Sequence, residues 1–347
     1  MGVGAGQDRR VRRRRGDADG RGRGGCRLSL RRAVRALLAV LLTAAVAVPL
    51  TAAARPAVPA PPPAEIPPVT ATTLERAYAA NRANAELASR MAAAHGDAHR
   101  ATADRALAAP SRGLLTFDGR GAGRVTEVLG DLAHADRVAV LVPGSDTSLD
   151  TYERFRTDAA SLYRRVDGQA PAGGSGAVVA WLGYTTPGTV SATAVTTDRA
   201  DGAAPALREF LHGLRALTGR PDARITVLCH SYGSVVCGRA AAGLDVDDLV
   251  LLGSPGTGAD SVTDLRTRAR VWAARGGDDW VAEVPHVGVD LFGTTVGFGA
   301  DPVSASFGAR VFTAGDAGHS DYYRPGSVSL TNLSRIVLGE TGEVTRA

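Results

Sequence analysis

Eight short apolar runs, separated by amphipathic stretches, constrain the fold of this chain more than any other feature. Several runs are continuous in Val, Leu and Ile, as expected for strands that are buried on both faces of a parallel sheet. Between two of them, Leu207, Leu211 and Leu214 repeat with the spacing of one helical face. This alternation predicts an α/β fold with a doubly wound, mostly parallel sheet of about eight strands. The runs are Leu114–Asp118, Arg124–Leu129, Val138–Val142, Ala177–Leu182, Ile225–Cys229, Leu249–Leu252, Val271–Ala274 and Val311–Thr313.

Composition divides the 347-residue chain into four segments of different character. A leader that is first basic and then apolar is followed by a stiff linker with seven prolines, an alanine-rich helical segment, and the α/β domain. Thr72 with Glu75 predicts a capping box at the start of the helical segment, and Gly96 predicts an interruption within it. The segments span residues 1–54, 55–70, 71–112 and 113–347, in that order.

The leader has the composition of an export signal. Its first 35 residues contain twelve Arg and three Asp, and the 19 residues from Ala36 to Ala54 are uncharged and end in three alanines. A basic region, an apolar region and a small-residue site predict a cleaved signal, and the alternative is an uncleaved membrane anchor. Either way, we expect the α/β domain to be secreted or held on the outer face of the cell membrane.

The basic character of the chain is confined to this leader. The formal net charge is +5, and the leader contributes +9, so the remaining residues carry about −4. No basic face is left for nucleic acid, which is therefore not expected as a partner. The membrane is expected as a partner only through the leader, and only if the leader is uncleaved.

The chemistry is concentrated at the end of the fifth apolar run. The sequence C-H-S-Y-G at residues 229–233 leads from a strand into a helix and resembles the nucleophile elbow of α/β hydrolases. Such a sharp turn strains the backbone of the serine and needs small residues two positions away on either side. Cys229 stands where glycine is usual. Ser231 is the predicted nucleophile, because the competing Ser234 falls inside the helix; the neighbouring His230 is interpreted as structural.

A nucleophilic serine needs a base and an acid that orients the base. In α/β hydrolases both follow the serine in the order acid, histidine, each just beyond a later strand. Gly276-Gly-Asp-Asp-Trp-Val follows the seventh apolar run, and Gly315-Asp-Ala-Gly-His-Ser follows the eighth. His319 is the predicted base. Asp279 is the predicted acid, with Asp278 as the alternative.

The oxyanion of the reaction needs two backbone N–H donors. One is expected from Tyr232, directly after the nucleophile, and the other from the loop that follows the third apolar run. In that loop, Gly144 allows the backbone to bend toward a substrate, and the donor is predicted to be the amide of Ser145 or Asp146.

Cys229 and Cys237 remain once the leader, which holds Cys26, is set aside. A disulfide between them would tie the nucleophile strand to its helix, and two buried thiols are the equally open alternative. The Cys and His spacings match no zinc site, and the glycine-rich loop at residues 253–258 lacks the Lys-Ser/Thr of a phosphate-binding loop. No metal and no cofactor are therefore predicted.

Five motifs together resemble an actinobacterial α/β-hydrolase family that is catalogued as a domain of unknown function. They are Leu141-Val-Pro-Gly-Ser, Trp181-Leu-Gly-Tyr, His230-Ser-Tyr-Gly-Ser, Leu252-Gly-Ser-Pro-Gly and Gly318-His-Ser-Asp-Tyr-Tyr. The resemblance spans roughly residues 114–340 and implies the α/β-hydrolase fold with a Ser-Asp-His triad. It implies no particular substrate.

The sequence favours a secreted serine hydrolase that cleaves an ester of a small-molecule acyl substrate. Amide cleavage, or acyl transfer to an alcohol, would use the same triad. A non-catalytic cell-envelope binding protein on the same scaffold is the alternative from a different class, although a binding module has no need of all three triad residues in order.

Overall fold

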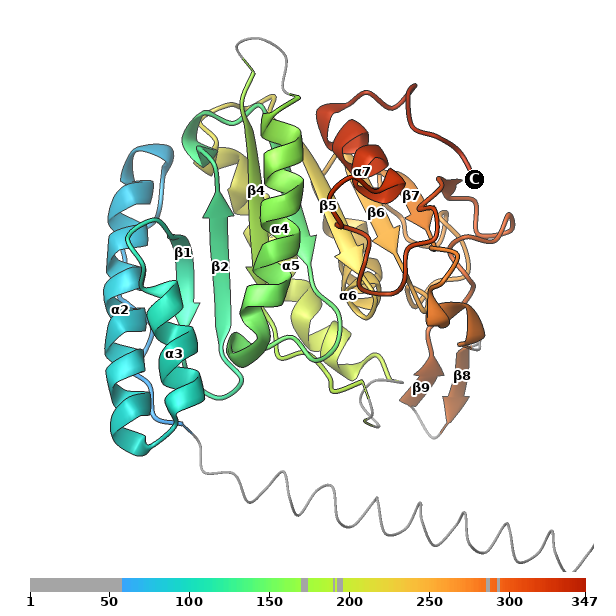
Figure 1. Cartoon of the computed structure of the whole chain (residues 1–347). Coiled ribbons are helices and arrows are strands. Elements are labelled where there is room, and N and C mark those ends of the chain that lie inside the picture. The colour runs from blue at the N-terminus through green and yellow to red at the C-terminus, as the bar shows by residue number, and fades with distance from the viewer. Residues whose placement is uncertain (1–57, 170–173, 190, 192–195, 285–287, 292–293) are drawn as a thin grey trace, which may run out of the picture. The chain divides into compact units, whose positions relative to one another are not determined.

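The computed structural model describes residues 58–169, 174–189, 191, 196–284, 288–291 and 294–347. Their centre is one eight-stranded sheet with the order β1-β2-β4-β3-β5-β6-β7-β10 (Figure 1). Only the pairs β1–β2 and β2–β4 are antiparallel. The prediction of a doubly wound, mostly parallel sheet is confirmed. The strands are β1 (Gly113–Asp118), β2 (Arg124–Leu129), β3 (Arg137–Val142), β4 (Gly176–Leu182), β5 (Arg224–His230), β6 (Asp248–Leu252), β7 (Arg270–Ala274) and β10 (Arg310–Val311), with β8 (Gly288–Leu291) and β9 (Thr294–Gly297) paired in a separate hairpin.

Helices cover both faces of the sheet because the strands are apolar on both sides. In β3, Val138 and Val140 pack into the core under α5 and α6, whereas Ala139 and Leu141 pack into the core under α4 and α7. Figure 1 shows α4 and α7 on the same side of the sheet. The helices are α2 (Leu74–His95), α3 (Ala98–Leu107), α4 (Tyr152–Asp167), α5 (Asp198–Leu217), α6 (Gly233–Ala240) and α7 (Val328–Leu338). The 3₁₀ turns are η1 (Ala71–Thr73), η2 (Leu132–His134), η3 (Leu149–Thr151), η5 (Ala241–Gly243) and η6 (Trp280–Glu283).

The alanine-rich segment forms α2 and α3, and α2 packs against the edge strand β1. Its buried face consists mostly of small residues, and the side-chain amide of Asn81 donates hydrogen bonds to the carbonyl oxygens of Leu114 and Leu115. Gly96 ends α2 with a positive φ of 89°, in agreement with the predicted interruption. The predicted capping box of Thr72 and Glu75 is wrong: the box joins Thr70 and Thr73, because a 3₁₀ turn precedes the helix.

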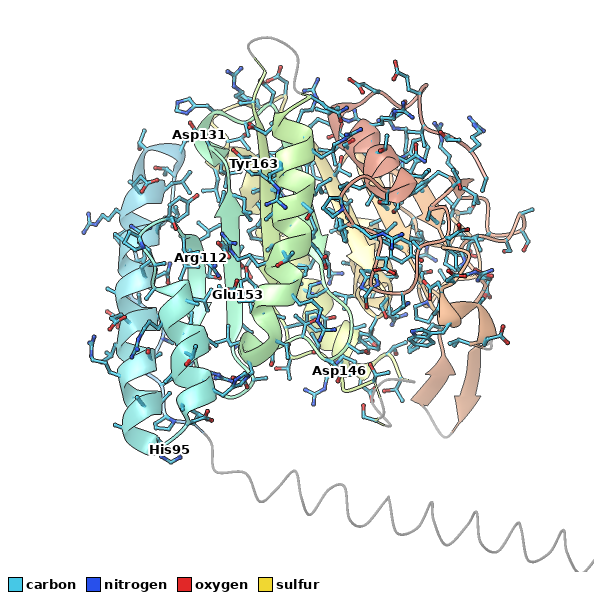
Figure 2. All side chains as sticks on the ribbon, in the orientation of Figure 1. His95, Arg112, Asp131, Asp146, Glu153 and Tyr163 are labelled. Atoms are coloured by element: carbon cyan, nitrogen blue, oxygen red, sulfur yellow. A yellow bond between two sulfur atoms is a disulfide. The ribbon has the colours of Figure 1, made fainter. Side chains whose placement is uncertain are left out.

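Ion pairs around the buried Arg112 and Glu127 tie this edge of the sheet to α4. Arg112, directly before β1, pairs with Glu153 on α4 at 2.8 Å and with the buried Glu127 on β2 at 2.9 Å (Figure 2). Glu127 also accepts hydrogen bonds from Arg156 and Tyr152. Every charge in this group has a partner of opposite sign, so the group serves to hold α4 against β2.

The predicted export signal or membrane anchor, residues 1–54, lies outside the described residues. The start of the predicted proline-rich linker, residues 55–57, lies outside them as well. Within the ranges given above, no helix combines the length and the apolar composition that crossing a membrane requires.

Candidate active site

The nucleophile elbow lies between β5 and α6. Ser231 has φ of +53°, a left-handed conformation that costs a non-glycine residue roughly 1–3 kcal/mol. A Cβ atom at Gly233 would lie 2.6 Å from the carbonyl oxygen of Val142, so only glycine fits there. The Ser231 amide donates a hydrogen bond to the carbonyl oxygen of Leu252 at 2.9 Å, which fixes the turn against β6.

A disulfide joins Cys229 to Cys237 across this elbow. Cys229 belongs to β5 and Cys237 to the second turn of α6, and both side chains are fully buried. Their Cα atoms lie 6.5 Å apart. Of the two alternatives that the sequence leaves open, the structure contains the disulfide, and this bond connects the strand before the nucleophile to the helix after it.

The structure brings Ser231, His319 and Asp279 together. His319 Nε2 lies 2.9 Å from Ser231 Oγ, and His319 Nδ1 lies 2.8 Å from Asp279 Oδ1. Because an ionised carboxylate only accepts hydrogen bonds, Nδ1 carries the proton and Nε2 is left to accept the hydrogen bond from Ser231 Oγ–H. This arrangement can remove a proton from the serine hydroxyl.

Of the two adjacent aspartates, Asp279 contacts His319 and Asp278 does not. Asp279 is 3% exposed, whereas the side chain of Asp278 is exposed and only its backbone pairs with Gly318. Burial alone would raise the pKa of Asp279. Hydrogen bonds from His319, Tyr322 and the Val281 amide outweigh this effect and hold the pKa below its usual value, so the carboxylate stays ionised next to the imidazole.

Two further residues hold the group in place, and the sequence pattern did not assign them these contacts. The Tyr322 hydroxyl donates to Asp279 Oδ2 at 2.5 Å and accepts from the Gly276 amide at 3.1 Å. His230 Nε2 lies 2.6 Å from the carbonyl oxygen of His319. Burial, followed by the charge of His319, lowers the pKa of His230 to about 4, so its ring is neutral and donates from Nε2. In the sequence, the only indication of the Tyr322 contacts was the position of this residue three places after His319.

The predicted oxyanion donors separate into two that fit and one that does not. The Asp146 amide donates to the carbonyl oxygen of Pro187 at 2.9 Å, so it cannot also serve an oxyanion, and that alternative is wrong. Within the described part of the chain, the amides of Ser145 and Tyr232 have no hydrogen-bond partner. A Cβ atom at Gly144 would lie 2.6 Å from Ser231 Cβ, which shows how closely this loop approaches the nucleophile.

A cavity of about 360 Å³ opens onto these groups. Ser231, His319 and Ser145 line it, and Trp280, directly after the acid, stands at its wall. Asp146, labelled in Figure 2, also lines the cavity, and its carboxylate accepts a hydrogen bond from the Thr189 amide. Within the described residues, no group of three or more His, Cys, Asp or Glu side chains is arranged to hold a metal ion.

The comparison with protein families agrees with this geometry. A family model described as "Alpha/beta hydrolase" matches residues 118–289, which include the elbow and Asp279. Over these residues, just under half of the chain, the sequence is similar to that α/β-hydrolase family, and the sheet described above has the order and helices of an α/β-hydrolase fold. The matched segment contains the nucleophile strand and the acid loop, and His319 follows it in the chain.

Two curated relatives of this α/β hydrolase are mycobacterial. The uncharacterized protein Rv2079 of Mycobacterium tuberculosis is 30% identical over 258 residues, which cover 65% of this chain and 38% of the relative. The uncharacterized protein Rv0963c of the same species is 33% identical over 168 residues, which cover 46% of this chain and 63% of the relative. The matches thus span less than two thirds of either relative. The predicted resemblance to an actinobacterial α/β-hydrolase family is confirmed.

Solved structures with a similar fold share little sequence with this chain. A serine hydrolase described as lacking a lid, XC6422 from Xanthomonas campestris, is 20% identical, with a TM-score of 0.41 over 67% of this chain and 94% of that one. Esterase PE8 is 17% identical, with a TM-score of 0.42 over 62% of this chain and 97% of that one. These similarities concern the fold.

Proposed function

We propose that this α/β hydrolase is a serine esterase that cleaves carboxylic esters through an acyl-enzyme on Ser231. The observation that carries the proposal is the continuous hydrogen-bonded series from Ser231 through His319 to the buried Asp279, with two spacings of 2.9 and 2.8 Å. A serine capping a helix would need neither partner. The strained turn at Ser231 supports the same proposal, because this turn places the Ser231 side chain at the cavity.

The first half of the reaction forms the acyl-enzyme. Ser231 Oγ attacks the ester carbonyl carbon while His319 Nε2 accepts the hydroxyl proton. The carbonyl oxygen becomes an oxyanion, which accepts hydrogen bonds from the amides of Ser145 and Tyr232. When the tetrahedral intermediate collapses, the bond between the carbonyl carbon and the alcohol oxygen breaks, and His319 returns the proton to the leaving alcohol.

The second half releases the acid. A water molecule gives a proton to His319 Nε2 and attacks the acyl carbon, and the proton then returns to Ser231 Oγ as the carboxylic acid leaves. Throughout, Asp279 holds the imidazole in one orientation and stabilises its charged form. Tyr322 and His230 act as positioning residues, through the acid and through the His319 backbone respectively.

Labelling with a fluorophosphonate tests the proposal, because this reagent reacts with an activated serine. Wild type should label and Ser231→Ala should not. Ser234→Ala is the matched control, since its hydroxyl donates to the Cys229 carbonyl oxygen inside the elbow and should not be needed for labelling. Equal labelling of wild type and Ser231→Ala, or no labelling of folded wild type, would show that the chain is not a serine hydrolase.

The disulfide also supports an extracytoplasmic location, because stable disulfides are rare in reducing compartments. We propose that the leader exports the domain, which then acts as a secreted protein or on the outer face of the membrane. The N-terminal residue of the protein recovered from the culture medium tests this idea. A protein found only in the cytoplasm would contradict it.

A further inference from the structure

Beyond the triad, the walls of the cavity combine polar, aromatic and small apolar residues. Within the described residues that line it, polar side chains are numerous: Thr147, Thr151, Arg154, Asp158, Thr189 and Ser320. Phe155 and Trp280 add aromatic surface and Val142 and Pro143 add apolar surface, while no Leu, Ile or Met among the described residues lines the cavity. A long aliphatic group would therefore displace water from polar groups without satisfying them, which is unfavourable.

One wall is the first part of α4. Thr151, Arg154, Phe155 and Asp158 are spaced at i, i+3, i+4 and i+7, so they share one helical face, and that face lines the cavity. Asp158 is partly buried and has no hydrogen-bond or ion-pair partner in the described part of the chain. Burial raises its pKa to about 7, Arg154 opposes the shift and Asp321 adds to it. Near neutral pH this carboxyl can both donate and accept a hydrogen bond.

A second side chain that lines the cavity has a polar group without a partner. The side chain of Tyr323 is 5% exposed and its hydroxyl has no hydrogen-bond partner among the described residues. Burial, followed by the charge of Asp158, raises the pKa of Tyr323, and both residues line the cavity. Buried polar groups without partners are rare in folded proteins, and a ligand or ordered water usually satisfies them.

Trp280 supplies a flat apolar surface at the same cavity. It is 51% exposed, an unusual exposure for a tryptophan, and its ring centroid lies 4.5 Å from that of His319. A group bound against the exposed part of this ring would lie next to the reacting atoms. The cavity therefore combines an exposed aromatic surface with unpaired donors and acceptors.

From this combination we infer that the alcohol part of the substrate is a carbohydrate carrying a short O-acyl group. The inference rests on the proposed esterase activity of Ser231. Sugar hydroxyls donate and accept, so they match Asp158 and Arg154, and the apolar face of a sugar ring fits an exposed tryptophan. A quaternary ammonium ester would place its cation near Arg154, and a long acyl chain would meet polar walls. Hydrolysis consumes one water and yields the short acid and the free sugar hydroxyl.

The test compares two acetate esters with rings of the same size. Methyl 6-O-acetyl-glucopyranoside carries ring hydroxyls, and cyclohexylmethyl acetate does not. Wild type should show a kcat/KM at least about tenfold higher for the sugar ester, because each lost hydroxyl leaves a polar group of the site unpaired. Similar values for the two esters, or a higher value for acetylcholine than for the sugar ester, would overturn the inference.

Variants of the wall provide the second arm. Asp158→Ala should lower the ratio of kcat/KM for the sugar ester to that for p-nitrophenyl acetate by about tenfold. Asp167→Ala, an exposed carboxylate at the far end of the same helix, is the matched control and should leave this ratio unchanged. Trp280→Ala, on a different element, should lower the ratio independently of any change in α4.

The outcomes separate the inference from the proposed function. An unchanged ratio in both wall variants would overturn the carbohydrate assignment, while turnover of p-nitrophenyl acetate and fluorophosphonate labelling would leave the esterase proposal intact. If wild type neither labels nor turns over any of these esters, both fall together.

Discussion

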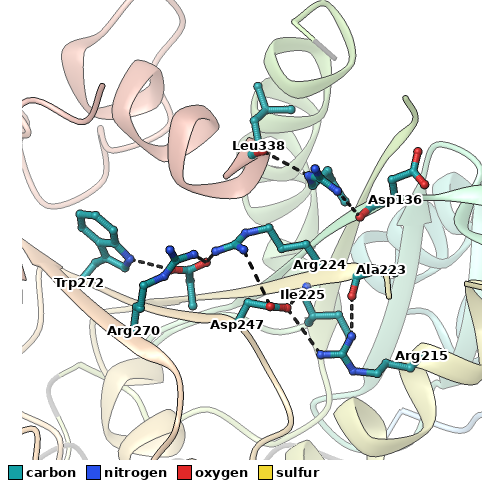
Figure 3. A network of polar contacts seen from close by, with 11 residues as sticks. Asp136, Arg215, Ala223, Arg224, Ile225, Asp247, Arg270, Trp272 and Leu338 are labelled. Atoms are coloured by element: carbon teal, nitrogen blue, oxygen red, sulfur yellow. Dashed lines mark hydrogen bonds and ion pairs between the residues drawn. The ribbon is translucent and has the colours of Figure 1, made fainter. Parts of the chain in front are cut away.

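The two ends of the parallel strands both hold a buried aspartate, and their partners differ in one property. At the amino ends, Asp248 accepts hydrogen bonds from Arg224, Arg270 and the Trp272 indole (Figure 3). At the carboxyl ends, Asp279 accepts from His319, Tyr322 and a backbone amide. A guanidinium is charged at every working pH, but an imidazole changes its charge near neutrality.

This difference explains why one end is structural and the other is suited to catalysis. Arg224, Asp248 and Arg270 are the first residues of β5, β6 and β7, so their pairing holds three strands in register without moving a proton. His319 can take the proton of Ser231 because its partner Asp279 stabilises the charged ring. Ligands in open α/β sheets bind beyond the carboxyl ends of the strands, as the cavity does here.

The largest expected effect is on kcat, and it should differ between variants of the two adjacent aspartates at the carboxyl ends of the strands. Asp279→Asn should lower kcat for p-nitrophenyl acetate by on the order of 10⁴, because an amide holds the imidazole in the wrong tautomer. Asp278→Asn should change kcat by less than about threefold, since that side chain is exposed. Steady-state kinetics of the two variants check this, and equal losses would show that the acid is wrongly assigned.

At the opposite end, Asp248→Asn should cost stability and spare catalysis. The change leaves two arginines facing an uncharged group, and we expect the free energy of unfolding to fall by about 3 kcal/mol, near the lower end for a broken buried pair because both arginines are partly exposed. Urea denaturation measures the loss. A large fall in kcat for the folded variant would contradict the division between the two ends.

The disulfide should contribute a smaller amount of stability to the catalytic end. Cys229 and Cys237 are separated by eight positions, and closing so short a loop in the unfolded chain is worth about 2–3 kcal/mol. The double variant Cys229→Ala/Cys237→Ala should lose that much free energy of unfolding. A stability equal to that of wild type under non-reducing conditions would mean that the bond contributes nothing.

His230 should give the smallest effect on stability, and this effect depends on pH. Its pKa falls from 6.5 to about 4 on folding, so between these values the unfolded chain binds a proton that the folded chain does not. The His230 contribution is fully present above pH 6.5 and is lost as the pH falls toward 4. Between pH 7 and pH 5, wild type should lose up to about 2 kcal/mol more than His230→Gln. Parallel pH profiles would contradict the neutral, buried ring.

Local patterns in the sequence were enough to place the strands and the elbow. Each predicted apolar run coincides with a strand of the sheet to within a few residues, because burial on both faces requires an unbroken apolar stretch. The elbow was visible for a similar reason, since the turn at Ser231 accepts only small residues two positions away. The triad candidates followed from the order of these strands along the chain.

Choices between adjacent residues could not be made in the same way. Asp278 and Asp279 have the same chemistry, and only the hydrogen bond between His319 Nδ1 and Asp279 Oδ1 in the folded chain shows which of them faces His319. Ser145 and Asp146 differ because Pro187, distant in sequence, occupies the Asp146 amide. The contacts of His230 and Tyr322 also depend on segments that meet only in the folded chain.

By itself, then, the sequence determined the sheet, the sharp turn that presents Ser231, and the order of serine, acid and histidine. Periodicity, residue size and chain order are properties of neighbouring residues, so they can be read without coordinates. The tertiary structure decided which aspartate contacts His319, which loop amide is left without a hydrogen-bond partner among the described residues, and that Cys229 and Cys237 are joined. Each of these depends on a distance between segments far apart in the chain, and only packing sets such distances.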